Sequence, residues 1–322
     1  MQPGGSHSNG PDAAASLRAR LRTALEPTVW AVGGGKGGVG KTLFSVNLAV
    51  AMARRGERVV LVDADLGGAN CHTVLGLASP QRCLADFISR KVERLDEVLV
   101  PTTIPNLWLA SGSRGLEAAN PRHVQKLKLL RHVRQLDVDH VLMDLGAGSA
   151  FNVLDFFLAA DERIVVVAPE PTSIENAYHF LKSAFYRSLR DTAKKGQRKT
   201  LIQNLLEERM KRGIRSPRAL VAAVTEVDAE AGEVLAERVQ RFSAHLVVNQ
   251  ARRAEHQRLG AEMELACQEY FGARITHLAT LPREDEVLDA IAERAVVYER
   301  SPNADFSRAI RGLAEHLGSR EP

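Results

Sequence analysis

The sequence predicts an α/β protein built on a doubly wound, mainly parallel sheet. Seven short apolar runs, rich in valine, isoleucine and leucine, recur along the 322 residues. The runs are continuous rather than alternating, as expected for parallel strands that are buried on both faces. Segments with helical periodicity stand between most of them. Strands that alternate with helices favour a parallel sheet covered by helices.

The expected strands begin after Pro27. They are TVWAV (28–32), RVVLVDAD (58–65), NLWLAS (106–111), HVLMDL (140–145), RIVVVAPE (163–170), HLVVNQ (245–250) and ITHLATL (275–281). The spacing of apolar residues predicts a helix from Thr42 to Arg55 and another that begins at Ser173. This alternation leads us to expect one α/β domain over residues 28–322.

Residues 1–27 are expected to form a flexible N-terminal arm. Its first part is rich in Gly, Ser, Pro and Ala, a composition typical of disorder. Leu17, Leu21 and Leu25 then fall on one stripe of a short amphipathic helix. Such a helix either packs on its own domain or binds a partner, and the sequence leaves both open.

The segment 187–242 contains no expected strand and is interpreted as a helical insertion of two or three short helices. Ser216 and Asp228 are plausible helix starts. The first part, 187–218, holds eleven Lys/Arg against three Asp/Glu. This part is either a solvated helical face or a docking surface for a partner, a nucleic acid or an anionic membrane.

Composition places the chain among ordinary soluble proteins. Hydrophobic residues make up 45% and charged residues 25%, and no apolar stretch approaches the roughly 18 residues of a membrane span. The N-terminus has no apolar signal core, so we expect a cytoplasmic protein. Cys71, Cys83 and Cys267 stand far apart without C-x-x-C spacing, which predicts neither a metal site nor a disulfide framework. The net charge of +4 does not by itself predict nucleic-acid binding.

A phosphate-binding loop follows the first expected strand. Gly35, Gly40, Lys41 and Thr42 satisfy G-x-x-x-x-G-K-[ST], and an amphipathic helix comes next, which is the context this P-loop motif requires. Glycines allow successive N–H groups to point inward, and the helix N-terminus adds partial positive charge. Lys41 would bridge the β- and γ-phosphates, and Thr42 would ligate Mg²⁺. The loop also contains Lys36, Gly37, Gly38 and Val39.

Two further segments supply carboxylates for the same site. RVVLVDAD ends in Asp63 and Asp65, and acids at the carboxyl end of a parallel strand face the crevice where ligands bind. HVLMDLGAG delivers Asp144 from another strand and continues into Gly146-Ala147-Gly148. This is the Walker B pattern of an acid near Mg²⁺, followed by a loop able to sense the γ-phosphate.

Lys36 is a second lysine in a loop that already has one. A cradle of backbone N–H groups needs no further cation beside its own phosphates. Lys36 could instead reach a phosphate held by a facing subunit and stabilise charge on the transferring phosphoryl group, as an arginine finger does. The alternative is an exposed lysine that only raises the local potential.

KGGVGKT (36–42) resembles the deviant Walker A motif of the MinD/ParA group of P-loop ATPases, and the resemblance covers most of residues 29–317. It implies an ATP-sandwich homodimer in which Lys36 crosses to the partner and Lys41 is the ordinary Walker lysine. Asp63 and Asp65 match the two switch I acids, the second tied to activation of the attacking water. Asp144 matches the switch II acid near Mg²⁺.

The same resemblance places residues around the adenine base. Asn249, in LVVNQ, matches the asparagine that contacts adenine. Pro282 and Asp285, in LPREDEV, resemble the segment that closes over the base. The implied cofactors are ATP and Mg²⁺, and the implied activity is a slow, dimerisation-dependent ATP hydrolysis.

Two longer stretches resemble one branch of the group more specifically. VDADLGGANCHTVLGL and DLGAGSAFNVLDFFLAADERIVVVAPEPTSIENAY are similar to the FlhG (FleN, YlxH) regulators of flagellar number and placement. DAAASLR (12–18) resembles the D-Q-A-x-x-L-R motif with which FlhG proteins stimulate their GTPase partner FlhF. Ala13 stands in place of the motif's glutamine. The resemblance therefore implies an FlhF-like GTPase as a possible partner of the N-terminal arm.

MinD and FlhG proteins usually end in an amphipathic helix that inserts into membrane. Here Phe306, Ile310, Leu313 and Leu317 share one helical face. The polar side is not strongly basic, unlike that of a typical membrane-surface helix. Packing on the sheet and peripheral contact with the inner face of the cell membrane, including at a pole, both remain open.

A nucleotide-switched regulator of spatial organisation is the function that these patterns favour. The alternative is a ParA-type ATPase that binds DNA without sequence preference, which the basic segment 187–218 favours. An iron–sulfur carrier of the related nitrogenase iron-protein type would need cysteine ligands at a dimer interface. Because Cys71 is a lone cysteine near a strand end, we expect it to be a core residue.

Overall fold

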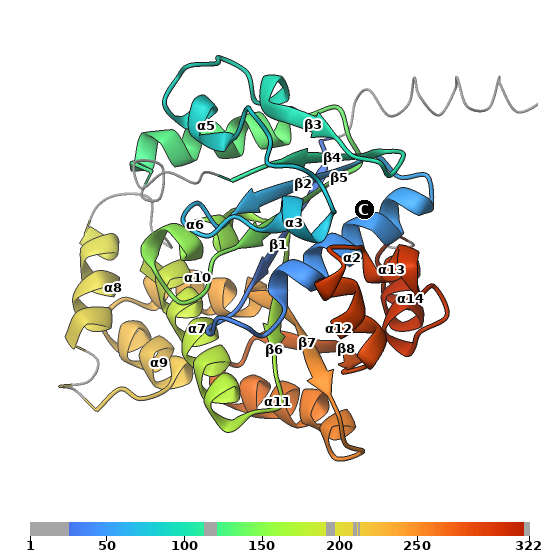
Figure 1. Ribbon diagram of the computed structural model, residues 1–322. Helices are drawn as coiled ribbons and strands as arrows, with labels where there is room; N and C mark the ends of the chain where they lie inside the picture. Colours follow the sequence, from blue (N-terminus) through green and yellow to red (C-terminus); the bar gives the residue numbers. More distant parts are fainter. Residues whose placement is uncertain (1–25, 113–120, 191–196, 209–210, 212, 319–322) are drawn as a thin grey trace, which may run out of the picture.

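One eight-stranded sheet forms the centre of the molecule in the computed structural model, which describes residues 26–112, 121–190, 197–208, 211 and 213–318 (Figure 1). The strand order is β3-β4-β2-β5-β1-β6-β7-β8. All neighbouring pairs are parallel except β3 with β4. The strands are β1 (Thr28–Gly33), β2 (Val59–Ala64), β3 (Leu99–Pro101), β4 (Leu107–Ala110), β5 (His140–Leu145), β6 (Glu162–Val167), β7 (Ser243–Ala251) and β8 (Arg274–Pro282). The doubly wound prediction is confirmed.

Helices cover both faces of this sheet. They are α2 (Lys41–Arg54), α3 (Cys71–Val74), α4 (Leu84–Ile88), η1 (Leu95–Val98), α5 (His123–Arg134), α6 (Phe151–Ala159), α7 (Pro171–Arg190), α8 (Gln197–Glu208), α9 (Pro217–Val227), α10 (Ala229–Arg241), α11 (His256–Phe271), α12 (Asp285–Ala292), α13 (Val297–Arg300) and α14 (Asp305–Gly318). All seven expected strands are present, as are the helices expected near Thr42 and Ser173.

Two hydrophobic clusters lie on opposite faces of the sheet. Successive residues of a strand point to opposite sides, so β1 sends Val29 and Ala31 into one cluster and Trp30 and Val32 into the other. The first cluster includes buried residues of α5, α6, α7 and α8 to α11, and the second includes those of α2 and α12 to α14. Strands buried on both faces explain why the sequence shows continuous apolar runs.

In the described part of the segment between α7 and β7 there are three helices, α8, α9 and α10. The predicted starts are confirmed, because Ser216 Oγ accepts a hydrogen bond from Ala219 N and Asp228 Oδ1 accepts one from Ala231 N. These caps satisfy N–H groups that the first turn of a helix leaves without partners. Parts of the basic stretch (191–196, 209–210 and 212) lie outside the described residues.

The C-terminal helix α14 packs on the protein itself. Its four stripe residues, Phe306, Ile310, Leu313 and Leu317, are at most 4% exposed. The helix contacts α2 and β8, so this apolar face forms part of the core and does not face outward. Among the described residues, no helix combines the length and hydropathy needed to cross a bilayer.

One strand escaped prediction. β3 has only three residues, ends in Pro101 and pairs antiparallel with β4 at the edge of the sheet. Proline is tolerated at such an edge, where one side of the strand needs no hydrogen bonds. Residues 1–25 of the N-terminal arm, including Leu17, Leu21, Leu25 and the motif at 12–18, lie outside the described residues.

Candidate nucleotide site

The carboxyl ends of β1, β2 and β5 bring the predicted P-loop and its acids together. Asp63 and Asp144 are directly paired across β2 and β5, and Asp144 also pairs with Val32 on β1. The chain leaves β1 at Gly33, forms the loop and enters α2 at Lys41. Parallel strands place their carboxyl ends at one edge, so residues far apart in sequence meet here.

The last turn of the P-loop depends on Gly40. Its φ of 91° is in the left-handed region, which favours glycine. A side chain at Gly40 would also meet Asn249, whose Nδ2 lies 2.2 Å from the position of an added Cβ. Asn249 Nδ2 donates a hydrogen bond of 2.9 Å to the carbonyl of Val39 and fixes the loop against β7.

The two lysines of the loop have different surroundings. Lys41 is 7% exposed, and its Nζ donates to the carbonyl of Lys36 at 3.3 Å. Burial lowers the pKa of Lys41, while the carboxylates of Asp144 and Asp65 oppose this change. Lys36 Nζ instead contacts Glu170 Oε2 at 3.1 Å and Thr172 Oγ1 at 3.0 Å, near the start of α7. Only Lys41 is therefore directed toward the acids of its own site.

Asp144 is bound to the first turn and a half of α2. Thr42 Oγ1 donates to Asp144 Oδ2 at 2.6 Å, and Ser45 Oγ donates to Asp144 Oδ1 at 2.8 Å. Burial raises the pKa of this carboxyl group, and the hydrogen bonds from Thr42 and Ser45 oppose the rise. These contacts hold a hydroxyl and a carboxylate side by side, as the predicted magnesium site requires.

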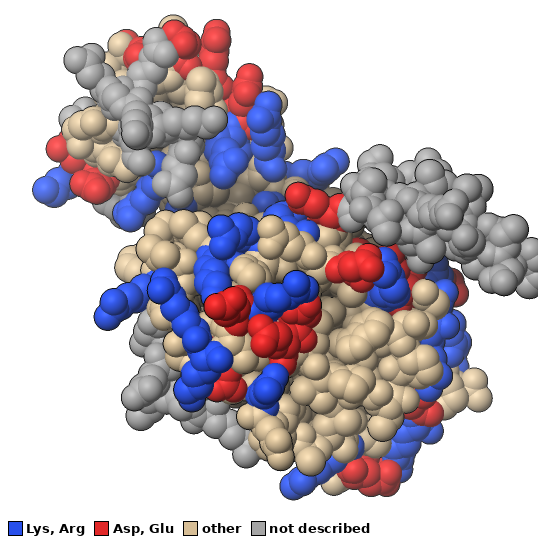
Figure 2. All heavy atoms as spheres, turned by 90° about the horizontal axis from the view of Figure 1, so that it is seen from above, with Lys and Arg blue, Asp and Glu red and all other residues tan. Residues whose placement is uncertain are grey.

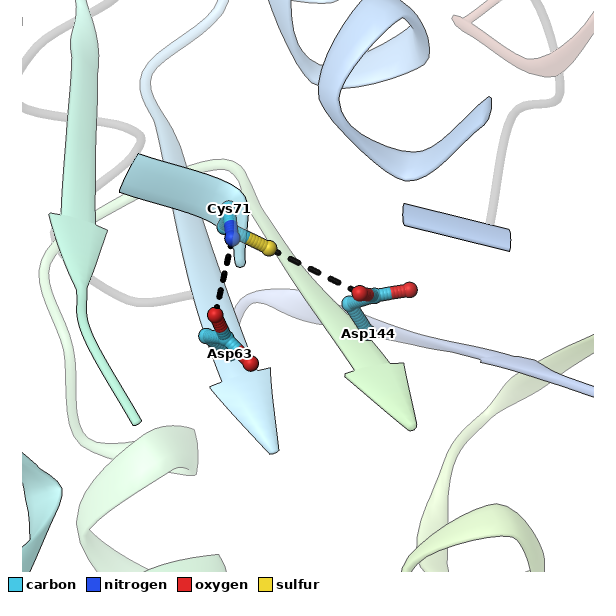
Figure 3. A group of neighbouring side chains, drawn as sticks. All are labelled: Asp63, Cys71 and Asp144. Atoms are coloured by element: carbon cyan, nitrogen blue, oxygen red, sulfur yellow. Dashed lines mark hydrogen bonds between the residues drawn. The ribbon is translucent and has the colours of Figure 1, made fainter. Parts of the chain in front are cut away.

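Asp63 and Cys71 lie beside Asp144 (Figure 3). Cys71 opens the short helix α3, and its backbone N donates to Asp63 Oδ2 at 2.9 Å. Cys71 Sγ lies 3.6 Å from Asp144 Oδ2. Burial, reinforced by the negative charge of Asp144, raises the pKa of Asp63 to about 7. Burial likewise raises the pKa of the Cys71 thiol.

Asp65 lies against the switch II loop that follows β5. Its carboxylate is 3.1 Å from the position that a Cβ on Gly146 would occupy and 3.2 Å from the one on Gly68. The same loop is tied to the P-loop, because Gly148 N donates to the carbonyl of Gly34 at 3.0 Å. The residues expected to sense the γ-phosphate are thus connected directly to those expected to hold it.

The residues predicted to surround adenine lie at the ends of β7 and β8. Asn249 is buried against the P-loop, Pro282 ends β8, and Asp285 is the first residue of α12. A cleft of about 270 Å³ is lined by Gln250, the residue after Asn249, but by none of these three residues. Its lining residues are Ala168, Pro169, Glu170, Gln250, Arg252, Arg253 and His256.

Several residues of the site were not foreseen. They are Ser45, Cys71, Glu170, Thr172 and Gln250, whose Nε2 donates to the carbonyl of Gly38. Ser45 and Gln250 lie close to motif residues in sequence and could have been found from that proximity. Glu170 and Thr172 meet Lys36 only through the sheet order. A larger cleft of about 550 Å³, near Trp108 and His132, contains none of the predicted site residues.

The donor set fits a hard divalent cation. Thr42, Asp63 and Asp144 offer oxygen atoms, which Mg²⁺ prefers. Among the described residues, Asp63 Oδ1 is buried without a hydrogen-bond partner, and buried carboxylate oxygens are normally paired. A cation at this edge would supply that partner. The fold and the site together define a P-loop nucleotide-binding protein.

The comparison with family models agrees with this class. The model of the CobQ/CobB/MinD/ParA nucleotide binding domain matches residues 30–297. The chain therefore belongs to the CobQ/CobB/MinD/ParA family of nucleotide-binding domains.

Among curated relatives, the chain is 43% identical over 156 residues to the antiactivator FleN of Pseudomonas aeruginosa, covering 48% of this chain and 55% of FleN. It is 30% identical over 163 residues to the flagellum site-determining protein YlxH of Helicobacter pylori, covering 47% and 52%. The chain spans about half the length of these curated relatives.

Solved structures agree on the fold. The septum site-determining protein MinD of Pyrococcus horikoshii, solved with Mg-ADP, matches with a TM-score of 0.62 and 21% identity, covering 91% of this chain and 96% of that one. A ParA family ATPase of Chlorobium tepidum matches with a TM-score of 0.62 and 18% identity, covering 91% and 99%. At these identities the likeness establishes the fold alone.

Proposed function

We propose that the protein is a dimerisation switch that binds and hydrolyses ATP and regulates spatial organisation in the cell. One observation carries this proposal. Lys41 and the strand-end acids converge on one site, whereas Lys36, from the same loop, extends to Glu170 and is not used by that site. Because Lys36 does not contact the nucleotide site of its own chain, it can reach the nucleotide bound by a facing copy.

The residues of one chain account for nucleotide binding. The N–H groups of the loop and the start of α2 hold phosphate oxygens, and Lys41 neutralises charge on the β- and γ-phosphates. Thr42, Asp63 and Asp144 hold Mg²⁺, which neutralises phosphate charge when bound. The buried hydrogen bonds of Asp144 with Thr42 and Ser45 keep these ligands oriented before nucleotide arrives.

Hydrolysis requires two further roles. Asp65, which lies against the switch II loop, orients the attacking water. Lys36 of a facing copy stabilises the charge that develops on the γ-phosphoryl group, as an arginine finger does. Asn249, Pro282 and Asp285 bound the adenine side. Because the second lysine comes from another chain, hydrolysis depends on dimerisation.

The relatives point to the process that the switch controls. FleN is named an antiactivator, YlxH a flagellum site-determining protein and the MinD relative of Synechocystis a septum site-determining protein. We therefore propose FlhG-like control of flagellar number or placement. An FlhF-like GTPase is the proposed partner of the N-terminal arm.

A ParA-type attachment to DNA is the less favoured alternative. On the face drawn in Figure 2, Lys and Arg are interspersed with Asp and Glu, and the net charge of +4 is small. Non-specific DNA binding relies on a basic surface and weakens steeply with salt. ATP-dependent DNA binding with that salt response would favour the alternative.

Light scattering tests the switch directly. The wild-type chain should be monomeric alone and dimeric with ATP and Mg²⁺. Asp65→Ala should hold the dimer because it blocks hydrolysis, and Lys36→Ala should bind nucleotide without forming a productive dimer. A chain that stays monomeric with saturating ATP and Mg²⁺ would refute the proposal.

Partner capture tests the cellular role. The ATP-locked Asp65→Ala chain serves as bait, and Lys41→Ala, which lacks the phosphate-binding lysine, is the matched control. An FlhF-like GTPase retained only by the locked bait would support the flagellar role. Equal retention by both baits would show that the partner does not depend on the nucleotide state.

A further inference from the structure

A buried thiol lies between the two buried carboxylates of the site. Cys71 is wholly buried and sits above the ends of β2 and β5, with its sulfur turned toward Asp144 (Figure 3). The backbone N–H of Cys71 donates a hydrogen bond to Asp63 Oδ2. Neither the P-loop motif nor the phosphate chemistry described above has a use for sulfur at this position.

Two observations indicate a cation at this cluster. One ligand atom from each of Asp63, Cys71 and Asp144 can be chosen so that all three lie within 4.8 Å of one another. Independently, the second carboxylate oxygen of Asp63 is buried and has no partner among the described residues. In Figure 3 this oxygen lies on the opposite side of the carboxylate from the one that accepts the Cys71 N–H. Such an atom calls for a positively charged neighbour.

The spacing suits a thiolate-binding metal. Zinc binds thiolate sulfur at about 2.3 Å and carboxylate oxygen at about 2.1 Å, so a tetrahedral angle separates the two donors by about 3.6 Å. Cys71 Sγ donates a hydrogen bond to Asp144 Oδ2 at 3.6 Å, and a metal ion would replace the proton of this contact. A pair of donors already at the ligand spacing needs little rearrangement.

We propose that the nucleotide-free chain binds one thiophilic divalent cation of the Zn²⁺ class through Cys71 Sγ and one carboxylate oxygen from each of Asp63 and Asp144. Water completes the four-coordinate shell. The thiol gives up its proton to the buffer as the metal–sulfur bond forms, so binding releases this proton. A thiolate ligand selects zinc and cadmium over magnesium, which prefers oxygen.

Occupancy of this site would exclude the magnesium-bound nucleotide, because both ions use Asp63 and Asp144. The inference concerns the nucleotide-free chain, so it does not depend on ATP hydrolysis or on dimerisation. If the proposed function failed, the metal site could still be present, and the reverse also holds.

Cd²⁺ provides the first test, because cadmium–thiolate bonds produce a charge-transfer band in the ultraviolet. The chain carrying Cys83→Ser and Cys267→Ser keeps Cys71 as its one cysteine. It should show a band that saturates at one equivalent of Cd²⁺ without nucleotide. Calorimetry of Zn²⁺ binding in two buffers of different ionisation enthalpy should report proton release.

Cys71→Ala, with Cys83 and Cys267 intact, should lose the saturable band. Cys71→Ser is a second variant of nearly equal size, in case alanine disturbs folding, and circular dichroism checks both. A single-equivalent band that survives in either folded variant would overturn the proposal. So would the absence of a band in the chain whose one cysteine is Cys71.

Cys83 and Asp86 supply a matched control for the carboxylates. Cys83 Sγ lies 3.7 Å from Asp86 Oδ2, a contact like that of Cys71 with Asp144, but it is partly exposed and not part of the three-residue cluster. Asp63→Asn should weaken Zn²⁺ binding by about ten-fold or more, and Asp86→Asn should leave it unchanged. Equal effects of the two changes would contradict the assigned ligands.

Discussion

Lys36 and Glu170 form an ion pair within one chain, with Lys36 Nζ 3.1 Å from Glu170 Oε2. The two side chains are 38% and 61% exposed. Ion pairs this exposed contribute little to stability, because water screens them and holding long side chains costs entropy. The contact therefore holds Lys36 only weakly, and Lys36 can exchange it for a phosphate of a facing copy.

Lys36→Ala should separate stability from activity. The free energy of unfolding should change by less than about 1 kcal/mol, because only an exposed pair is lost. ATP hydrolysis should fall by about 10³-fold or more, the range found for arginine fingers. Urea unfolding and phosphate release measure the two effects. A large loss of stability, or hydrolysis at the wild-type rate, would assign Lys36 a structural role instead.

The pH dependence of stability should report the burial of Asp63. Burial and the charge of Asp144 raise its pKa from 3.8 to about 7 in the folded chain. Between these values the native state keeps a proton that the unfolded chain has released, so the contribution of Asp63 to stability falls as pH rises and levels off above pH 7. The difference is at most about 4 kcal/mol.

Comparison with Asp63→Asn isolates this contribution from those of the other acids. The amide keeps a carbonyl oxygen for the Cys71 N–H and cannot titrate. Denaturant unfolding of both chains, without nucleotide or metal, should give curves against pH that converge near pH 4 and diverge toward pH 7, with the variant becoming relatively more stable. Parallel curves would show that Asp63 is ionised throughout.

The fold could be predicted because its strands are buried on both faces. A run such as Val59–Val62, 0% exposed at every position, has no polar alternation and stands out in the sequence. β3 could not be found in this way, since an edge strand of three residues that ends in proline carries no comparable pattern. The apolar stripe near the C-terminus predicted a helix but not what its apolar face contacts. A membrane and a protein core both select the same pattern of apolar residues.

The site was predictable where chemistry follows sequence spacing. Lys41 and Thr42 belong to one motif, and Asp63 and Asp144 each end an apolar strand. The contact between Lys36 and Glu170 joins residues 134 positions apart and depends on β1 lying beside β6. Cys71 offered no spacing signal, since its ligand-like neighbours come from two other segments.

Alanine substitutions at two glycines of the P-loop should destabilise the chain to different extents, according to the φ angle of each glycine and the room for a Cβ atom. Gly40→Ala should destabilise the chain by about 1–3 kcal/mol or more, because alanine is strained at a φ of 91° and its Cβ would meet Asn249 Nδ2. Gly37→Ala is the control, since an added Cβ there meets nothing within 4 Å and its φ is not positive. Thermal unfolding compares them. Equal midpoints would mean that the loop relaxes without cost, and the role of Asn249 in fixing it would be withdrawn.

Leucine-to-alanine changes on α14 and α12 should establish whether α14 packs in the core or anchors the chain to a membrane. Leu313 on α14 is 4% exposed and packed in the core, whereas Leu288 on α12 is 45% exposed. Leu313→Ala should lower the free energy of unfolding by about 2–5 kcal/mol, because it leaves a cavity. Leu288→Ala should cost less than about 1 kcal/mol.

Since the apolar face of α14 is already covered by α2 and β8, the folded wild-type chain should not float with anionic vesicles through this helix. If Leu313→Ala leaves stability unchanged but abolishes flotation, the face is open in solution and α14 is a membrane anchor rather than part of the core.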